Sequence, residues 1–286
     1  ELFVGKRAHL RYSTIENWSK NMYNLNTKRA RVDEDGDIEW ISGSFGSHVG
    51  YLYPMSVLNG RRARSSFTGI TFAGAGQNLD TGCKVVLNAP ETSATVETKG
   101  ISKSGGIQTF RSSIVATPKA EGSKATVSCQ SLMLDDQSRS DTIPAMDIRA
   151  KNVDIGHEAT IGRIGDDKVF YLMSRGIPEE EARTMIVNGF ADPVSKELPL
   201  EYAVEMNNLI RLEMKGDWIM GALTLNHVNA MPAATWHQLH MNETTVDVPE
   251  GLEAARSVVV EANEALLGPQ DAFDAAVAAA QAELDA

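Results

Sequence analysis

The sequence has few cysteines, few aromatic residues and no long apolar run. Its two cysteines among 286 residues cannot form a disulfide framework, which favours a cytoplasmic protein because the cytoplasm keeps thiols reduced. No apolar run approaches the roughly 18 residues of a membrane helix, so we expect no membrane partner. The first residues, Glu1–Lys6, are neither an initiator methionine nor a signal peptide, and we expect a piece of a longer protein.

Positive charge is also scarce. Lys and Arg number 27 against 38 Asp and Glu, which gives a net charge of −11. A protein that binds nucleic acid through backbone phosphates needs clustered positive charge, so the composition argues against nucleic acid as a partner. The hydrophobic content of 42% is ordinary for a folded domain and too high for a disordered chain.

Up to about residue 160 the chain consists of short segments typical of β-strands. Turn clusters such as Asp35-Gly36 and Asn59-Gly60 separate segments rich in Val, Ile, Thr, Ser and Phe. No helical periodicity interrupts them, which makes an α/β alternation a poor fit. A sandwich, a barrel and a parallel β-helix all remain. The many Thr and Ser residues and the lack of close hairpin spacing favour a β-solenoid slightly, although no clean internal period is present.

After residue 164 the pattern predicts three short amphipathic helices. The first passes through 169–173. The second follows Pro178, which suits a first-turn position, and is expected to stop near Asn188-Gly189. The third runs from about Pro199 to Gly216. Their apolar faces need a partner, which is either the β-rich part or another protein.

Cys129 is the first residue of chemical interest. It alternates with Ala125, Val127 and Ser131 on one face of a predicted strand. A lone cysteine in that setting is more often a small buried hydrophobe, but a thiolate can also act as a nucleophile or a soft metal ligand. Cys83 follows a turn at the start of a strand, and we expect it to be structural.

His157 and Glu158 place an imidazole beside a carboxylate, in a stretch that reads as a loop. Neighbouring side chains on a strand point to opposite faces, so the two could bind one metal only where the backbone turns. A solvated pair is the alternative. The chain has no His-Glu-x-x-His motif, which excludes a zinc protease on motif, and the glycine-rich segment 74–82 lacks the ending of a phosphate loop.

Several segments taken together resemble one known family. They occur in order over residues 1 to about 216, so the combination is far more specific than any single motif. The segments are Tyr12–Trp18, Thr27–Ala30, Asp80–Gly82, Asp136–Asp141, Gly156–Thr160, Phe170–Gly176, Met185–Phe190 and Glu197–Ala203. They resemble the SufB/SufD family of the SUF iron–sulfur cluster assembly system, and within it the SufB subunit.

The resemblance implies a fold and a set of partners. SufB-type chains form a right-handed parallel β-helix followed by a C-terminal α-helical domain, which here would occupy 1–164 and 165–216. The family pairs SufB with its paralogue SufD, and each helical domain docks a SufC-type ATPase. Sulfur arrives as persulfide from a cysteine desulfurase and its carrier, and clusters pass to apo iron–sulfur proteins. We therefore expect an assembly scaffold and not an enzyme, with ATP hydrolysis in the SufC-like partner.

Residues 217–286 depart from this pattern. The family normally ends near Gly216, whereas 70 further residues follow here. We expect an atypical acidic extension with helices at about 250–267 and 269–285, part of which is similar to the start of a SufD-type chain. The N-terminal half of the family, including the cysteine thought to accept sulfur first, is expected to be missing.

The same resemblance assigns roles to five residues. Cys129 corresponds to the family's interface cysteine, a sulfur acceptor and cluster ligand. Glu158 corresponds to a carboxylate implicated as an iron ligand, and His157 beside it is a further candidate metal ligand. Trp18 and Lys28 correspond to residues on the path of sulfur through the β-helix.

The implied cofactors are iron and a transient iron–sulfur cluster. Two cysteines cannot supply four thiolates, so ligands from a partner, nitrogen or oxygen ligands, or exogenous thiols must complete the site. Glu16 stands where relatives carry Gln, which leaves its role undecided. Two other classes stay open. One is a carbohydrate-active β-helix enzyme, against which the 6% aromatic content argues, and the other is a structural interaction module with an inert thiol.

Overall fold

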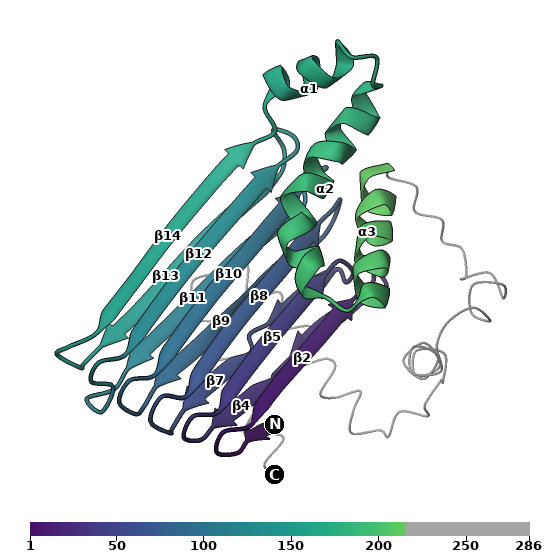
Figure 1. Ribbon diagram of the computed structural model, residues 1–286. Helices are drawn as coiled ribbons and strands as arrows, with labels where there is room; N and C mark the ends of the chain where they lie inside the picture. The colour runs from purple at the N-terminus through teal and green to yellow at the C-terminus, as the bar shows by residue number, and fades with distance from the viewer. Residues whose placement is uncertain (216–286) are drawn as a thin grey trace, which may run out of the picture. The chain divides into compact units, whose positions relative to one another are not determined.

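The computed structural model describes residues 1–215, where fourteen strands precede three helices (Figure 1). The predictions for 217–286 lie outside these residues. The strands are β1 Leu2–Val4, β2 His9–Glu16, β3 Tyr23–Asn26, β4 Arg29–Val32, β5 Asp37–Ser44, β6 Val49–Leu52, β7 Met55–Leu58, β8 Arg64–Ala73, β9 Asn78–Leu87, β10 Ser93–Ser102, β11 Ile107–Ala116, β12 Lys124–Met133, β13 Arg139–Ile148 and β14 Asp154–Arg163. The helices are α1 Asp166–Met173, α2 Glu179–Glu197 and α3 Leu200–Lys215.

The chain alternates between two parallel sheets. Sheet B has the order β14-β12-β10-β8-β5-β2, and sheet A has the order β1-β4-β7-β9-β11-β13, with β6 joined to β9 and β3 joined to β6. From β8 onward, successive strands of the chain lie in opposite sheets and each strand pairs with the equivalent strand one coil later. The predicted parallel β-helix followed by helices is thereby confirmed, and the sandwich and the barrel are excluded.

The coils differ in length, which explains why the sequence shows no fixed period. Partner residues in sheet B lie 28 residues apart between β2 and β5 and 27 apart between β5 and β8. The spacing is 31 between β10 and β12 and 30 between β12 and β14. A repeat is recognised by constant spacing. Here the turns change length from coil to coil, while the hydrogen-bonded register keeps the strands aligned.

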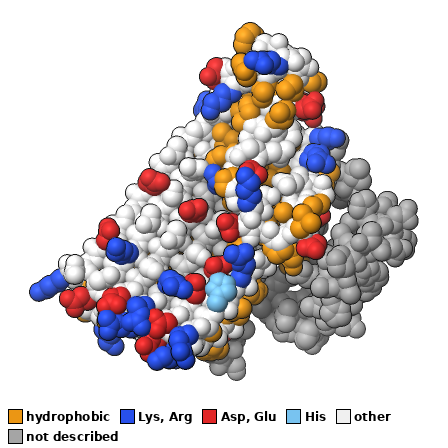
Figure 2. Space-filling view, in the orientation of Figure 1, with side chains coloured by type: hydrophobic (Ala, Val, Ile, Leu, Met, Phe, Trp, Pro, Cys, Tyr) orange, Lys and Arg blue, Asp and Glu red, His pale blue; other side chains and the backbone are white. Residues whose placement is uncertain are grey.

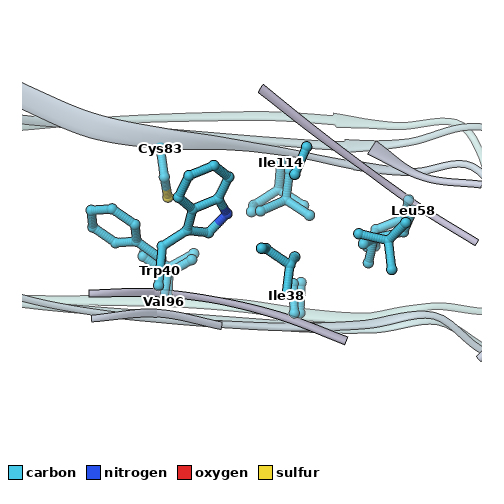
Figure 3. Packing of buried hydrophobic residues seen from close by; sticks show 14 of the residues in the cluster. Ile38, Trp40, Leu58, Cys83, Val96 and Ile114 are labelled. Carbon is cyan, nitrogen blue, oxygen red and sulfur yellow. The ribbon is translucent and has the colours of Figure 1, made fainter. Parts of the chain in front are cut away.

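The interior of the solenoid has an apolar half and a polar half. The apolar half is a close-packed cluster that includes Ile38, Trp40, Leu58, Cys83, Val96 and Ile114 (Figure 3). The polar half lies where the sheet B strands end and the sheet A strands begin. Its buried side chains include Ser42, Ser44, Thr71, Thr81, Gln108 and Ser131. Burying hydroxyl groups is favourable only when they find hydrogen-bond partners, as Thr71 and Thr81 do at 3.0 Å.

Two of the helices cover the outer face of sheet B. They share a second buried core with it, and α1 adds a smaller third cluster around Val169. The solenoid contributes Ile41, Phe45, Ile70, Phe72 and Ile101 to the second core, and the helices contribute Val187, Ala191, Val194, Leu198, Met206, Leu209, Ile210 and Met214. All described residues belong to one compact unit. The apolar faces predicted for α2 and α3 are therefore partly satisfied by the solenoid itself.

The prediction that the second helix stops near Asn188-Gly189 is wrong, because α2 continues to Glu197. Its buried stripe runs on past Gly189 through Ala191 and Val194 against the second core. Pro193 lies inside the helix on its exposed side, where its ring meets solvent. Tertiary burial thus outweighs the helix-breaking preference of both residues. No helix in residues 1–215 is long and apolar enough to span a membrane.

Candidate functional site

Cys129 and His157 meet on the inner face of sheet B. They lie on the paired strands β12 and β14, with Val127 opposite His157 in the register. The Cys129 Sγ is 3.4 Å from the His157 Nε2 and also 3.4 Å from the main-chain oxygen of Glu158. Burial raises the pKa of the Cys129 thiol, and the nearby Glu158 carboxylate adds to that rise. A sulfur and an imidazole nitrogen at this separation can serve one soft metal ion as two of its ligands.

The Glu158 carboxylate points to the opposite face. The segment that was expected to be a loop is the middle of β14, so that expectation is wrong, and the two neighbouring side chains diverge as strand geometry requires. The Glu158 Oε1 accepts a hydrogen bond of 2.8 Å from the Ser128 hydroxyl on the outer face. The structure therefore brings Cys129 and His157 together and holds Glu158 apart from them across the edge strand.

The pair lies next to an edge of the solenoid. Within residues 1–215, β13 and β14 are the last strands of their sheets. Large apolar side chains are exposed along both edge strands: Ile143, Met146 and Ile148 on β13, and Ile161 on β14. Strand edges with exposed apolar side chains are sites at which another chain can pair.

A column of side chains at matching register positions runs across sheet B from this edge to the first coils. Thr14, Ser42, Gly69, Thr98 and Cys129 are successive partners across sheet B. Four steps of about 4.8 Å place Thr14 roughly 19 Å from Cys129. A cavity of about 10 Å³ lies in this polar half, lined by Ser42, Thr71, Thr81, Thr98 and Gln108 among others. It is about large enough for one water molecule, so the column is polar but closed.

Lys28 and Glu16 form a partly buried ion pair at the far end of that column. The Lys28 Nζ is 2.7 Å from the Glu16 Oε1 and 3.4 Å from the Thr14 hydroxyl. Asn24 donates a further hydrogen bond of 2.7 Å to the Glu16 carboxylate. Sequence reasoning predicted a role for Lys28 and left Glu16 open. The signal that was missed is Glu16 itself, two residues before Trp18. It is a charged side chain on the face of β2 that otherwise points uncharged side chains into the solenoid.

Trp18 lies just beyond the end of β2, and its main chain packs closely against that of Gly46. A Cβ on Gly46 would lie 2.0 Å from the Trp18 main-chain oxygen, so glycine is required for this close approach. The indole Nε1 of Trp18 is buried without a hydrogen-bond partner among the residues that the structure describes. The structure thus places Trp18 near the Lys28 end of the column and away from Cys129.

Cys83 is enclosed in the apolar half of the interior, beside Trp40 and Val96 (Figure 3). Burial raises the pKa of its thiol to about 12, so the thiolate that would react or bind metal is scarce at neutral pH. This environment agrees with the structural role expected for Cys83.

A second group of metal-ligand types lies on the outer face of sheet B. One ligand atom each from His9, Asp37 and Glu39 lie within 4.8 Å of one another. Arg11 already binds the Glu39 carboxylate at 2.5 Å, and Arg64 approaches Asp37 at 3.5 Å. A cation would have to displace both arginines, so we assign no metal to this group.

Comparison with known proteins shows what the chain is similar to. Residues 1–190 match the family model described as "SUF system FeS cluster assembly, SufBD core domain". Proteins named "Iron-sulfur cluster assembly SufBD family protein" are 49% identical in Staphylococcus saprophyticus and Staphylococcus haemolyticus and 48% identical in Staphylococcus aureus, each over 216 residues. The alignments cover 76% of this chain and 46% of each relative, so the chain spans about half the length of these relatives. These names do not distinguish SufB from SufD.

Proposed function

The chain belongs to the SufBD family of the SUF iron–sulfur cluster assembly system, and from this premise we propose that it acts as a SufB-type scaffold on which a nascent cluster is built. The observation that carries the proposal is the Cys129–His157 contact beside the open edge of the solenoid. At this edge a thiol and an imidazole are placed to bind iron and sulfur, and a partner chain would supply the remaining ligands. Family membership leaves the carbohydrate-active alternative without support.

Cys129 takes sulfur in the proposed step. A donor persulfide from a cysteine desulfurase or its carrier gives its terminal sulfur to Cys129, so the donor's S–S bond breaks and a new S–S bond forms on Cys129. The proton of the Cys129 thiol ends on the donor, which leaves as a thiol. Iron, the second substrate, then binds the cysteine sulfur with His157 as a nitrogen ligand. The Glu158 carboxylate lies on the outer face with Ser128, so it would join this iron only after the edge strand β14 rearranges.

The polar column is the proposed route of sulfur from the Lys28 end to Cys129. Lys28 and the hydroxyl groups of Thr14, Ser42 and Thr98 provide hydrogen-bond donors for an anionic persulfide. Because the cavity there is about the size of one water, passage requires transient opening of the interior. Trp18 lies at the entrance of this route by resemblance to the family.

Two surfaces are proposed for partners. The edge formed by β13 and β14 would pair with a SufD-like paralogue, which brings further ligands to the cluster. The exposed apolar side chains of the helices would dock a SufC-like ATPase. These include Phe170 at 71% and Leu200 at 76% exposure, and Figure 2 shows apolar side chains gathered over the helices. Completed clusters would pass to apo iron–sulfur proteins.

The test is anaerobic purification of the chain with SufC-like and SufD-like partners, followed by iron and sulfide analysis. We expect a brown complex with a broad absorption band near about 400 nm, as iron–sulfur charge transfer produces. The Cys83→Ser variant is the matched control and should keep this band. A colourless wild-type complex that still contains all partners would favour the structural module with an inert thiol.

A further inference from the structure

A buried group of charges joins the last turns of α3 to the solenoid. Glu213 is only 5% exposed, and its Oε2 is 3.3 Å from the Nζ of Lys20, which lies in the segment between β2 and β3. Lys103, in the turn after β10, donates to the main-chain oxygens of Glu213 at 3.0 Å and of Met214. Two separate turns of the solenoid therefore hold the C-terminal end of one helix.

The solenoid is shaped to admit these charges. A Cβ on Gly74 would lie 3.0 Å from the Glu213 Oε2 and 3.1 Å from the Lys20 Nζ. Gln77 fixes this turn, because its Oε1 accepts from the Gly74 main-chain nitrogen at 2.9 Å. Its Nε2 donates to the Phe45 main-chain oxygen at 3.0 Å. The space for the ion pair is thus part of the fold rather than a chance surface contact.

Burial shifts the pKa values of the charged side chains in this group. It raises the pKa of Glu213 to about 7, against the opposing influence of Lys20 and Lys103. Burial likewise lowers the pKa of both lysines. The negative charge of an ionised Glu213 in the last turn of α3 interacts unfavourably with the helix dipole. The positive charge of Lys103, bound to the last main-chain oxygens of the helix, interacts favourably with it.

The other charges around the group come from three elements. Lys103 also experiences the negative charges of Glu180 on α2 and Asp135 in the turn after β12. On α3 itself, Arg211 and Lys215 are exposed to solvent. Glu213 is therefore the carboxyl group that the docked helix buries, and its proton is the one most strongly tied to docking.

We propose that Glu213, buried beside Lys20 and Lys103, is a proton-operated latch: the last turns of α3 dock most firmly on the solenoid while Glu213 is uncharged, and they loosen when it ionises. An undocked Glu213 has an ordinary affinity for its proton, and the docked one holds the proton more tightly. By linkage, the docked state is favoured at acidic pH and loses this advantage as pH rises from about 4.5 to about 7. The latch does not depend on the proposed cluster chemistry.

The test is hydrogen exchange of the α3 main chain in the whole 286-residue chain, corrected for the pH dependence of intrinsic exchange. Between about pH 5.5 and about pH 8, the opening equilibrium of the last turns of α3 should increase by roughly tenfold or more in the wild type. Glu213→Gln should hold the helix equally firmly at both pH values. Glu205→Gln, which changes an exposed glutamate of the same helix, should keep the wild-type dependence.

A second variant and a direct titration keep the proposal testable if Glu213→Gln folds poorly. Lys20→Met removes the charge that favours the carboxylate, so the opening should level off at a higher pH than in the wild type. Isotope-edited NMR of the Glu213 carboxyl should show a midpoint near about 7. Unchanged pH dependence in Glu213→Gln, or a Glu213 midpoint near about 4.5, would overturn the latch.

Discussion

At the scale of single residues, position within the coil separates two thiols that the sequence presents alike. Cys83 sits among Trp40 and Val96 in the apolar half, whereas Cys129 contacts an imidazole next to the edge of the solenoid. Burial raises the pKa of both thiols, to about 12 for Cys83. Both side chains are almost fully buried, at 4% and 3% exposure, so any reactive difference comes from His157 and from the place of Cys129 one strand from the edge of the solenoid.

The first prediction concerns Cys129→Ser. Oxygen replaces sulfur with little change in volume, so the free energy of unfolding should fall by at most about 1–2 kcal/mol. Cluster formation in the complex with SufC-like and SufD-like partners should be lost. Denaturant unfolding and absorption of the anaerobic complex measure the two effects. A serine variant that reconstitutes normally would remove Cys129 from the proposed mechanism.

The second prediction is a difference in thiol reactivity. In the folded protein at about pH 7.5, iodoacetamide should modify Cys129 at least about tenfold faster than Cys83. Burial raises the pKa of Cys83 to about 12, and only the edge strand β14 separates Cys129 from the end of the described solenoid, where local opening is easiest. Both rates should rise with pH, because both pKa values lie above the ordinary range. Mass spectrometry of tryptic peptides gives the two rates from one sample. Equal rates would mean that the interior opens as readily at Cys83 as at the edge.

Alternation along β12 was readable from sequence, and the inward position of Cys129 agrees with it. The strand at His157 was not readable. Gly156 and the polar residues around it resemble a loop, and the partner that makes this segment a strand lies 30 residues earlier on β12. Local patterns cannot supply a pairing of that separation. The same limit concealed the Glu16–Lys28 ion pair, whose partners are brought together by the coil.

At the scale of secondary structure elements, both ends of the third helix were predicted to within one residue, and the end of the second helix was not. The third helix was expected from about Pro199 and begins at Leu200. The second passes through Gly189 and Pro193 because its buried stripe continues on sheet B. A boundary decided by packing against a distant strand is invisible to local propensity.

The third prediction tests this packing on α3. Ile210 is fully buried in the second core and Leu212 is half exposed on the same helix. Ile210→Ala should lower the free energy of unfolding by about 2–4 kcal/mol, through lost apolar burial and a cavity. Leu212→Ala should change it by less than about 0.5 kcal/mol. Similar losses for the two variants in urea unfolding would contradict the docking of α3 on sheet B.

The fourth prediction concerns the proposed ATPase surface. Deleting 166–216 would be a poor test, because it would expose Ile70 and Phe72 of the second core. Phe170→Ser and Tyr171→Ser change exposed residues of α1 instead. Together they should abolish co-purification with a SufC-like ATPase and leave the free energy of unfolding within about 0.5 kcal/mol of the wild type. Retained binding would place the docking surface elsewhere.

At the scale of the whole molecule, the solenoid turns sequence positions about 30 residues apart into neighbours in one column. Thr14 and Cys129 share such a column although they lie in different parts of the sequence. Resemblance to a family indicated that Lys28 and Cys129 belong to one route. The register places Cys129 in the same column as Thr14, which Lys28 contacts, so the proposed route would follow one column. Composition and periodicity could not predict that alignment.

The same stacking leaves one end of the described solenoid with two strands, β13 and β14, that are each paired on one side only, and the fifth prediction concerns that edge. Met146 is 44% exposed on β13 and Ile161 is 45% exposed on β14. Replacing both with Lys puts charge where a SufD-like partner would bury apolar surface, so pairing should weaken by at least about tenfold. Light scattering of the mixed chains measures pairing, and a cooperative thermal transition shows that the fold persists. Thr95→Lys, on the exposed face of β10, adds one lysine away from the edge and should leave pairing unchanged. Full pairing by the double variant would mean that the partner joins through another surface, and Cys129 would then need its remaining cluster ligands from there.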